Sequence, residues 1–195
     1  MYENTKATFL RWSQNRLYHN VFKGTGLHIN PGEDPIKKNN FPLVDKIETL
    51  NLSNFDLKDD GIEELKTSFD FVLFTSLVGY EQEPEEVINH ILKVVKSKGH
   101  LIITVPDEDL YEQGNFPSLF NRGHLKTFSV YKHESWSGKH YNMIDVVEKI
   151  ETASCRKIEL VDTNYNYSLI GTGVDQTVQF VDGVETNIEV ILRKY

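Results

Sequence analysis

The chain has 195 residues, of which 39% are hydrophobic and 26% are charged, and its formal net charge at pH 7 is −8. This composition suits one globular domain, disfavours a nucleic acid partner and excludes an intrachain disulfide, because Cys155 is the single cysteine. No apolar run approaches the length of a membrane span and the first residues lack a secretory pattern, so we expect a cytoplasmic protein with no membrane partner.

The N-terminal part of the chain is predicted to hold a helix and two strands. Residues 5–20 carry apolar side chains at mixed spacing, which indicates a short helix. Residues 27–29 have the character of a short buried strand, and residues 30–35 form a turn because Pro and Gly set backbone angles that no strand continues. Residues 46–52 alternate between apolar and polar side chains, as a strand does.

The centre of the chain has the most regular pattern. Residues 70–76 are a nearly continuous apolar run, typical of a strand covered on both faces. Residues 84–96 have helical apolar spacing, with Pro84 suited to the first position and Gly99 just past the end. Residues 100–105 form another apolar strand. A strand, a helix and a strand within so few residues predict a parallel crossover unit, and therefore an α/β fold with a doubly wound sheet.

The C-terminal half alternates between regular and irregular stretches. Residues 106–142 are rich in aromatic side chains with little periodicity, and they form either a substrate wall or a small satellite core. Residues 143–153 are predicted to be helical, and residues 157–161 and 187–192 are predicted to be strands. Residues 162–186 are too irregular to assign.

Ligands of an open doubly wound sheet bind outside the carboxyl ends of the strands. That rule directs a cofactor to residues 30–34, 51–56 and 76–81, which follow the first three predicted strands. It directs a substrate to residues 106–110 and 162–167, together with the aromatic residues.

The stretch FDFVLFTSLVGYEQEPEEVINHILKVVKSKGHLIITVPD resembles the central half of class I S-adenosylmethionine-dependent methyltransferases. In these proteins a strand beginning Phe-Asp leads through a loop to a helix that often starts after Glu-Pro, as at Glu83-Pro84. LHINPGEDP resembles their glycine motif, residues 123–129 resemble a His-x-x-x-Phe-Ser segment, and NIEVILRKY resembles their last strand. Small bacterial members that accompany capsule and surface-polysaccharide genes are the most similar group.

This resemblance implies a fold, a cofactor and an activity. The fold is a Rossmann-like, doubly wound and mostly parallel sheet with an antiparallel C-terminal strand. One strand of the family's sheet is reduced, missing or paired differently, since residues 51–70 leave little room for a strand and a helix. The activity is methyl transfer from S-adenosylmethionine to oxygen or nitrogen of a small molecule or sugar-linked acceptor. Residues 1–195 form one domain, with a cofactor-binding half (20–105), an aromatic substrate-side insertion (106–142) and a C-terminal part (143–195).

By the same resemblance, eight residues are candidates for cofactor binding. They are His28, Asn30, Pro31, Gly32, Asn51, Leu52, Ser76 and Leu77. Several depart from the family pattern, since Asn30 replaces the first glycine, Asn51 holds the position of the acid that binds ribose, and Gly79-Tyr80 replaces a Glu-His pair. Two hypotheses stay open: an enzyme with a reshaped pocket, or a catalytically silent paralogue that binds a partner. A nicotinamide-dependent oxidoreductase is a weaker rival, because no Gly-x-Gly-x-x-Gly follows the first strand.

Two residues are candidates for a catalytic base. His124 is the first, and its alternative role is to order the aromatic residues through a hydrogen bond. Tyr80 is the second, and its alternative role is a hydrophobic lid over the cofactor. No metal site is expected, because His133 and His140 lack convincing further ligands. The resemblance is also compatible with a homodimer or with a complex between this chain and an active paralogue.

Overall fold

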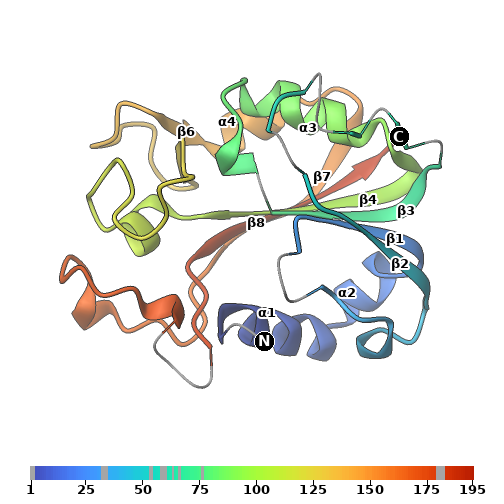
Figure 1. The fold of residues 1–195 in the computed structure, drawn as a ribbon, viewed down its shortest axis with the longest axis horizontal. Helices are drawn as coiled ribbons and strands as arrows, with labels where there is room; N and C mark the ends of the chain where they lie inside the picture. The colour runs from blue at the N-terminus through green and yellow to red at the C-terminus, as the bar shows by residue number, and fades with distance from the viewer. Residues whose placement is uncertain are drawn as a thin grey trace.

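The computed structural model describes residues 3–31, 35–52, 55–57, 61–62, 64–65, 67–75, 77–178 and 183–195. A six-stranded sheet in the order β2-β1-β3-β4-β8-β7 forms its centre (Figure 1). The strands are β1 (Gly24–Ile29), β2 (Val44–Leu50), β3 (Phe69–Phe74), β4 (Val95–Pro106), β7 (Ala153–Val161) and β8 (Asn187–Lys194).

The first four strands in the sheet order are parallel, whereas β8 runs antiparallel to β4 and β7 runs antiparallel to β8. This topology confirms the predicted α/β fold with a mostly parallel sheet and an antiparallel C-terminal strand. The described residues between β2 and β3 contain no helix or strand, so that β2 is an edge strand. The shortness of this connection is what the sequence predicts.

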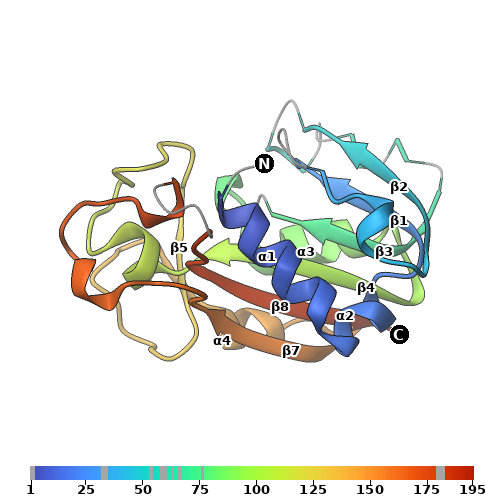
Figure 2. The same cartoon turned by 90° about the horizontal axis from the view of Figure 1, so that it is seen from below.

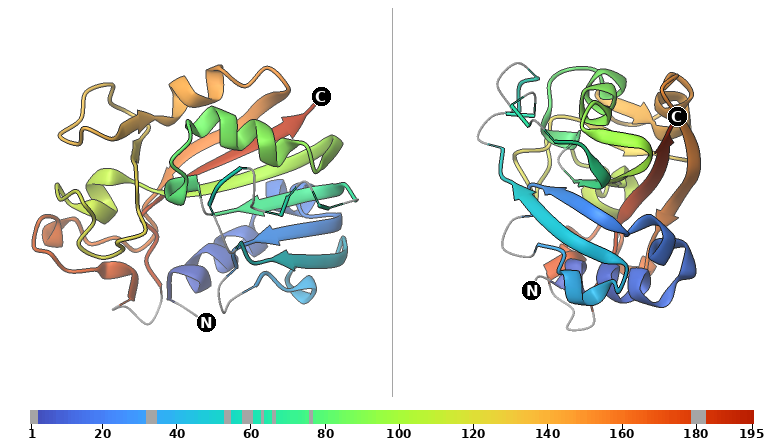
Figure 3. Two further views of the ribbon diagram at one scale, coloured as in Figure 1. Left: turned by 45° about the horizontal axis from the view of Figure 1, so that its top comes forward. Right: turned by 90° about the vertical axis from the view of Figure 1, so that its right-hand side faces the viewer.

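Helices cover both faces of the sheet (Figures 1 and 3). The helices α1 (Glu3–Gln14) and α2 (Arg16–Val21) lie on one face, and α3 (Pro84–Leu92) and α4 (Met143–Glu148) lie on the other. Each face has its own apolar cluster, one around Trp12, Phe22 and Phe71, the other including Phe74 and Ile91. Gly26 in β1 is needed for the first cluster, because a Cβ there would lie 2.0 Å from the ring of Phe71.

Some predicted boundaries differ from the structure. The helix predicted to reach residue 96 ends at Leu92, because Phe69 N–H donates to Val94 O at 2.8 Å and Val95 pairs with Phe69 as the start of β4. The helix predicted over 143–153 ends at Glu148, and the strand predicted from residue 157 already begins at Ala153, which pairs with Lys194 of β8. Pairing with a neighbouring strand overrides helical spacing at these ends.

Two irregular segments lie together beyond the carboxyl end of β4 (Figures 1 and 2). Residues 106–142, called the aromatic segment below, hold the π-helical turn η3 (Glu108–Glu112) and a parallel pair, β5 (Thr127–Ser129) with β6 (His140–Asn142). The connection from β7 to β8 holds the short turns η4 (Tyr167–Leu169) and η5 (Gln176–Val178). No helix in the described part of the chain has the length and apolarity to span a membrane.

Candidate functional site

A cavity of about 480 Å³ opens at the carboxyl ends of β1, β3 and β4. We call it the strand-end cavity. It is lined by Thr8, Phe9, Trp12, His28, Asn30, Pro31, Leu73, Thr75, Thr104, Pro106, Tyr111, Asn121, Thr177, Val178 and Asn187. The strands supply its floor, α1 supplies one wall, and the aromatic segment with η5 supplies the opposite side. The cavity therefore occupies the position where doubly wound sheets bind ligands.

His28 is the titratable group on the floor of the strand-end cavity. It is 4% exposed, and its Nδ1 accepts a hydrogen bond from Ile36 N–H at 3.1 Å. Burial lowers the pKa of His28 to about 4, because a charged imidazole would lose its hydration there. His28 is thus neutral at pH 7 and carries its ring proton on Nε2.

Asn30 closes the turn that follows β1. Its φ is 53°, in the left-handed region that asparagine tolerates better than most residues. Its side-chain Oδ1 accepts from Leu52 N–H at 2.7 Å, and its backbone N–H donates to Leu50 O at 2.8 Å. Asn30 therefore links the carboxyl ends of β1 and β2, and Leu52 contributes its backbone N–H to this link.

A buried ionic network holds α1 against the sheet. The guanidinium of Arg11 donates to Glu185 and Glu189 at 2.9 Å each, and Trp12 Nε1 donates to Glu189 at 2.7 Å. Both glutamates are 0% exposed. Thr8 Oγ1 adds a hydrogen bond to Glu185 at 2.6 Å. Helix α1, which forms one wall of the strand-end cavity, is thus held in place by charge-assisted hydrogen bonds from residues on either side of Phe9.

The charges in this network stabilise one another. Burial alone would raise the pKa of Glu189, but the hydrogen bond and charge of Arg11 and the charge of Lys157 hold it below its usual range. Burial would lower the pKa of Arg11, but its bonds to Glu185 and Glu189 raise it above its usual value. Arg11 and Glu189 are therefore both charged at neutral pH.

The opposite wall carries a histidine–carboxylate pair. Tyr111 lines the strand-end cavity, and its ring centroid lies 5.2 Å from that of His124. His124 Nδ1 lies 2.6 Å from Glu112 Oε1, and both residues are buried. The backbone N–H of His124 donates to the carbonyl of Asn121, a second lining residue, at 3.1 Å. His124 therefore contacts two lining residues of this wall but does not itself line the cavity.

The described residues that line the strand-end cavity carry no formal charge at neutral pH. Hydroxyl and amide groups supply its polarity, and Phe9, Trp12 and Tyr111 supply aromatic surface. Burial raises the pKa of Tyr111 above its usual value, so its phenol stays protonated. A ligand is met by neutral hydrogen-bonding groups and aromatic rings.

The structure brings only part of the predicted cofactor set to this cavity. His28, Asn30 and Pro31 line it. Asn51 is exposed and is not a lining residue, and Leu77 is 0% exposed within the main apolar cluster. Gly32 and Ser76 lie outside the described residues.

The structure separates the two candidate bases. Tyr80 is 0% exposed, and its ring meets Phe55 and Phe74 edge to face with centroids 5.6 and 6.1 Å apart. Lys126 Nζ donates to its carbonyl oxygen. Tyr80 thus lies in the core beneath the loop after β3, whereas His124 lies beside a lining residue of the cavity.

Sequence reasoning missed several lining residues. Thr75 and Thr104 lie at the carboxyl ends of β3 and β4, so the strand-end rule would have found them. Thr8 and Thr177 gave no comparable signal, because each reaches the cavity from a distant or irregular segment. In the aromatic segment, Tyr111 lines the cavity, whereas Phe128 is 0% exposed and belongs to the main apolar cluster rather than to a satellite core.

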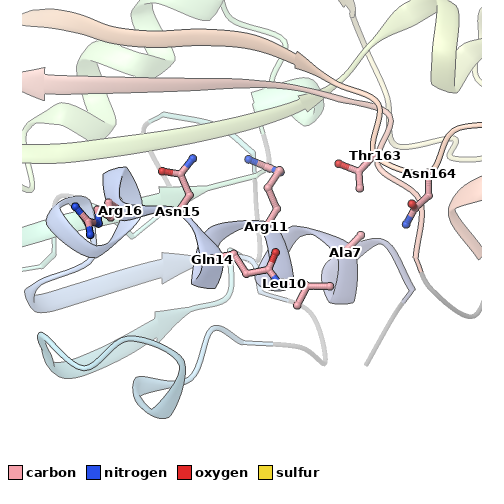
Figure 4. Close-up of a pocket in the computed structure, with 8 residues that line it drawn as sticks. All are labelled: Ala7, Leu10, Arg11, Gln14, Asn15, Arg16, Thr163 and Asn164. Carbon is pink, nitrogen blue, oxygen red and sulfur yellow. The ribbon is translucent and has the colours of Figure 1, made fainter.

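A second hollow of about 440 Å³ lies between α1 and the residues that follow β7 (Figure 4). We call it the outer hollow. It is lined by Ala7, Leu10, Arg11, Gln14, Asn15, Arg16, Thr163 and Asn164. Figure 4 shows Arg11 directed toward the sheet, where Glu185 and Glu189 already engage its guanidinium. The outer hollow does not border the ends of β1, β3 or β4, so we place the candidate site in the strand-end cavity.

The described residues include no group of three His, Cys, Asp or Glu side chains placed to hold a metal ion. His133 contacts Asp145 at 3.4 Å, and His140 Nε2 lies 2.8 Å from Ser129 Oγ. These two histidines therefore have partners of their own within the described chain.

Comparisons with known proteins agree with this geometry. The profile of the methyltransferase domain family matches residues 9–145. A search of curated proteins gives no match. Among solved structures, the N-methyltransferase NodS from Bradyrhizobium japonicum WM9, in complex with S-adenosyl-L-homocysteine, is similar with a TM-score of 0.52 at 11% identity, covering 97% of this chain and 85% of that one.

Two further structures share the fold at similar levels. An S-adenosylmethionine-dependent methyltransferase from Clostridium acetobutylicum has a TM-score of 0.54 at 13% identity, covering 98% of this chain and 92% of that one. The plantazolicin methyltransferase BpumL, in complex with a triazolic desmethylPZN analog and S-adenosylhomocysteine, has a TM-score of 0.55 at 14% identity, covering 97% of this chain and 84% of that one.

Proposed function

Because the chain belongs to the methyltransferase domain family, we propose that it transfers a methyl group from S-adenosylmethionine to a small molecule held in the strand-end cavity. The observation that carries the proposal is the position of this cavity, at the carboxyl ends of β1, β3 and β4 and closed by α1. The cofactor complexes of NodS and BpumL support the choice of cofactor.

The residues present fit this cofactor. A volume of about 480 Å³ is within the usual size of small-molecule sites. The cationic sulfonium is compatible with the faces of Phe9, Trp12 and Tyr111, since aromatic rings attract cations. Thr75, Thr104 and Asn187 offer hydroxyl and amide groups for its polar parts. When bound, the cofactor supplies an activated methyl group, and the chain aligns the acceptor and excludes water.

The acceptor that we propose is a small molecule or a sugar-linked group, and the resemblance to capsule-associated members supports a role in surface-polysaccharide biosynthesis. The net charge of −8 supports an acceptor other than nucleic acid. The single cysteine, Cys155, supports a cytoplasmic location. A homodimer or a pair with a paralogue remains part of this proposal.

Calorimetric titration with S-adenosylmethionine and S-adenosylhomocysteine, with NAD as the negative control, tests the proposal. We expect micromolar affinity for the first two ligands, equivalent to about −8 kcal/mol. Thr75→Val and Thr104→Val each remove one hydroxyl from the strand-end cavity and should weaken binding by about 2- to 10-fold. The matched control Thr163→Val alters the outer hollow and should leave affinity unchanged.

Two outcomes would contradict the proposal. If Thr163→Val weakens binding while the other two variants do not, the ligand occupies the outer hollow. If the folded protein binds neither cofactor form, the chain is a silent member of the family. The position of Asn51, exposed and away from the cavity, is the observation that favours this alternative.

A further inference from the structure

The sheet has an open edge at β2. In the described part of the chain β2 pairs with β1 alone, and Figures 2 and 3 show it as the outermost strand on its side of the sheet. Asn30 N–H donates to Leu50 O at 2.8 Å, so Leu50 directs its backbone groups toward β1. Because backbone groups alternate along a strand, Ile47 and Thr49 direct theirs outward. Such outward N–H and C=O groups are a template for another strand.

The opposite edge of the sheet, β7, is less suited to pairing. Its register against β8 shifts between Cys155 and Lys157, which leaves Arg156 outside the ladder. A bulge of this kind protects an edge from further strands. Lys157 is also engaged within the chain, since its Nζ lies 3.0 Å from Glu189 Oε1. In β2 the register shift lies at the start of the strand, and residues 46–50 pair regularly with β1.

Two opposite charges flank Ile47 at the open edge. The side chains of Lys46 and Glu48 are 67% and 38% exposed, and Lys46 Nζ lies 2.7 Å from Glu48 Oε1. The backbone groups of these two residues face β1, so an added antiparallel strand would meet them at non-hydrogen-bonded positions. Facing side chains approach each other most closely at such positions. The charges there therefore decide which strand fits beside β2.

The sequence of β2 is complementary to itself in one register. When a second, antiparallel copy is centred on Ile47, Lys46 faces Glu48 of the copy, and Glu48 faces Lys46 of the copy. Ile47 then faces its own counterpart with its backbone groups directed at it. Moving the centre by one residue in either direction sets Lys46 against Lys46 or Glu48 against Glu48, and like charges in facing positions are destabilising.

We propose that a second copy of this chain pairs with the open edge of β2, antiparallel and centred on Ile47, so that one sheet continues through a two-fold symmetric dimer. This interface goes beyond the proposed methyl transfer and does not depend on it. The copy takes the place next to β2 that no strand of the described chain occupies. A dimer held by one pair of short strands buries little surface, so its formation depends on concentration.

Charge exchange at the edge tests the proposal. Lys46→Glu makes all four facing charges negative, and Glu48→Lys makes all four positive. Sedimentation velocity of the full chain from about 1 to 500 μM should show a dimer for the wild-type protein and at least about 10-fold weaker dimerisation for each variant alone. An equimolar mixture of the two variants should dimerise within about 5-fold of the wild-type affinity, because a negative edge then meets a positive one.

The control and the contrary outcomes are equally definite. Lys139→Glu makes the same change of net charge on an exposed side chain of the aromatic segment and should leave dimerisation unchanged. Far-ultraviolet circular dichroism verifies that each variant is folded. A wild-type protein that stays monomeric, single variants that dimerise normally, or a mixture that fails to recover would each overturn the proposal.

Amide hydrogen exchange, followed by NMR, identifies the edge directly. The N–H groups of Ile47 and Thr49 should become protected as the concentration rises, whereas that of Glu48, which faces β1, should be protected throughout. A dimer in which Ile47 and Thr49 exchange unchanged would overturn the assignment to β2. Because β2 supplies no described lining residue to the strand-end cavity, both single variants should bind S-adenosylhomocysteine as the wild-type protein does. Failure of the dimer therefore leaves the proposed methyl transfer intact.

Discussion

The two sides of the strand-end cavity are both held by buried carboxylates, but the groups that neutralise those carboxylates differ. On the α1 side, Glu185 and Glu189 share Arg11, which stays charged at any accessible pH. On the side of the aromatic segment, Glu112 is paired with His124 and Glu108 with Lys132. One wall is therefore held by an arginine that two carboxylates share, and the other is held by a histidine and a lysine that each pair with a different glutamate.

This difference leads us to expect unequal contributions to stability from the two walls. On the α1 side one cation serves two buried carboxylates, so its removal affects both. On the side of the aromatic segment each glutamate has its own partner, so the removal of one cation leaves the other pair intact. The predictions below test how far the two walls differ.

The largest effect is expected on the α1 wall. Arg11→Met should lower the free energy of unfolding by about 3 to 5 kcal/mol, because it leaves two buried carboxylates without their shared cation. Urea unfolding at pH 7 measures the change. The matched control is Arg16→Met in the neighbouring helix α2, where the side chain is exposed and the cost should stay within about 0.5 kcal/mol. Equal costs for both variants would show that the network contributes no stability.

The stability that the aromatic segment contributes should change with pH in the opposite direction from the stability that the α1 network contributes. Burial raises the pKa of Asp107 to about 6, although the backbone N–H groups of Leu110 and Asp109 oppose this. A raised folded pKa means that its contribution is present in acid and is lost as the pH rises through 6. The pKa of Glu189 is lowered instead, so its contribution to stability is present at neutral pH and is lost as the pH falls through the folded pKa.

Asp107→Asn removes the titration and keeps the Oδ1 acceptor of both backbone bonds. The variant should be more stable than the wild-type protein by about 3 kcal/mol at pH 7 and by roughly half as much at pH 5. Urea unfolding at the two pH values checks this, with Asp45→Asn as an exposed control. A gain that grows toward acid would contradict the sign.

A moderate effect is expected when the cation of the aromatic segment is removed. Lys132 Nζ lies 2.7 Å from Glu108 Oε1 and 2.7 Å from Asp109 Oδ1. Lys132→Met should cost about 2 kcal/mol, because Glu108 is fully buried, but less than Arg11→Met, because Ser135 still donates to Glu108. Chemical denaturation gives the value, and a cost above that of Arg11→Met would reverse the ranking of the two walls.

The smallest effect concerns a single hydroxyl group of the α1 network. Tyr18 OH accepts from Arg11 Nη1 at 2.8 Å and from Lys157 Nζ at 2.6 Å, and it donates to Glu189. Tyr18→Phe should cost about 1 kcal/mol, the usual net worth of one hydrogen bond, since Glu189 keeps its other donors. Thermal unfolding detects this change, and a cost near that of Arg11→Met would mean that the phenol rather than the guanidinium holds the network.

The sequence by itself determined the parallel centre of the sheet and the direction of its last strand. The apolar run of β3, the helix start at Pro84 and the strand before Pro106 are local patterns that follow from burial on both faces and from backbone preferences. The strand-end rule pointed to an edge of the sheet that does hold a cavity, and His28, Asn30 and Pro31 line it.

Only the tertiary structure decided which side chains at that edge meet. Tyr80 turned into the core because the rings of Phe55 and Phe74 cover it, and Asn51 stayed outside because β2 is an edge strand. Thr8 reaches the site from α1, where Glu185, 177 positions further along the chain, holds it. Glu112 finds His124 across an irregular loop. Such contacts depend on the packing of distant segments, which carries no local period in the sequence.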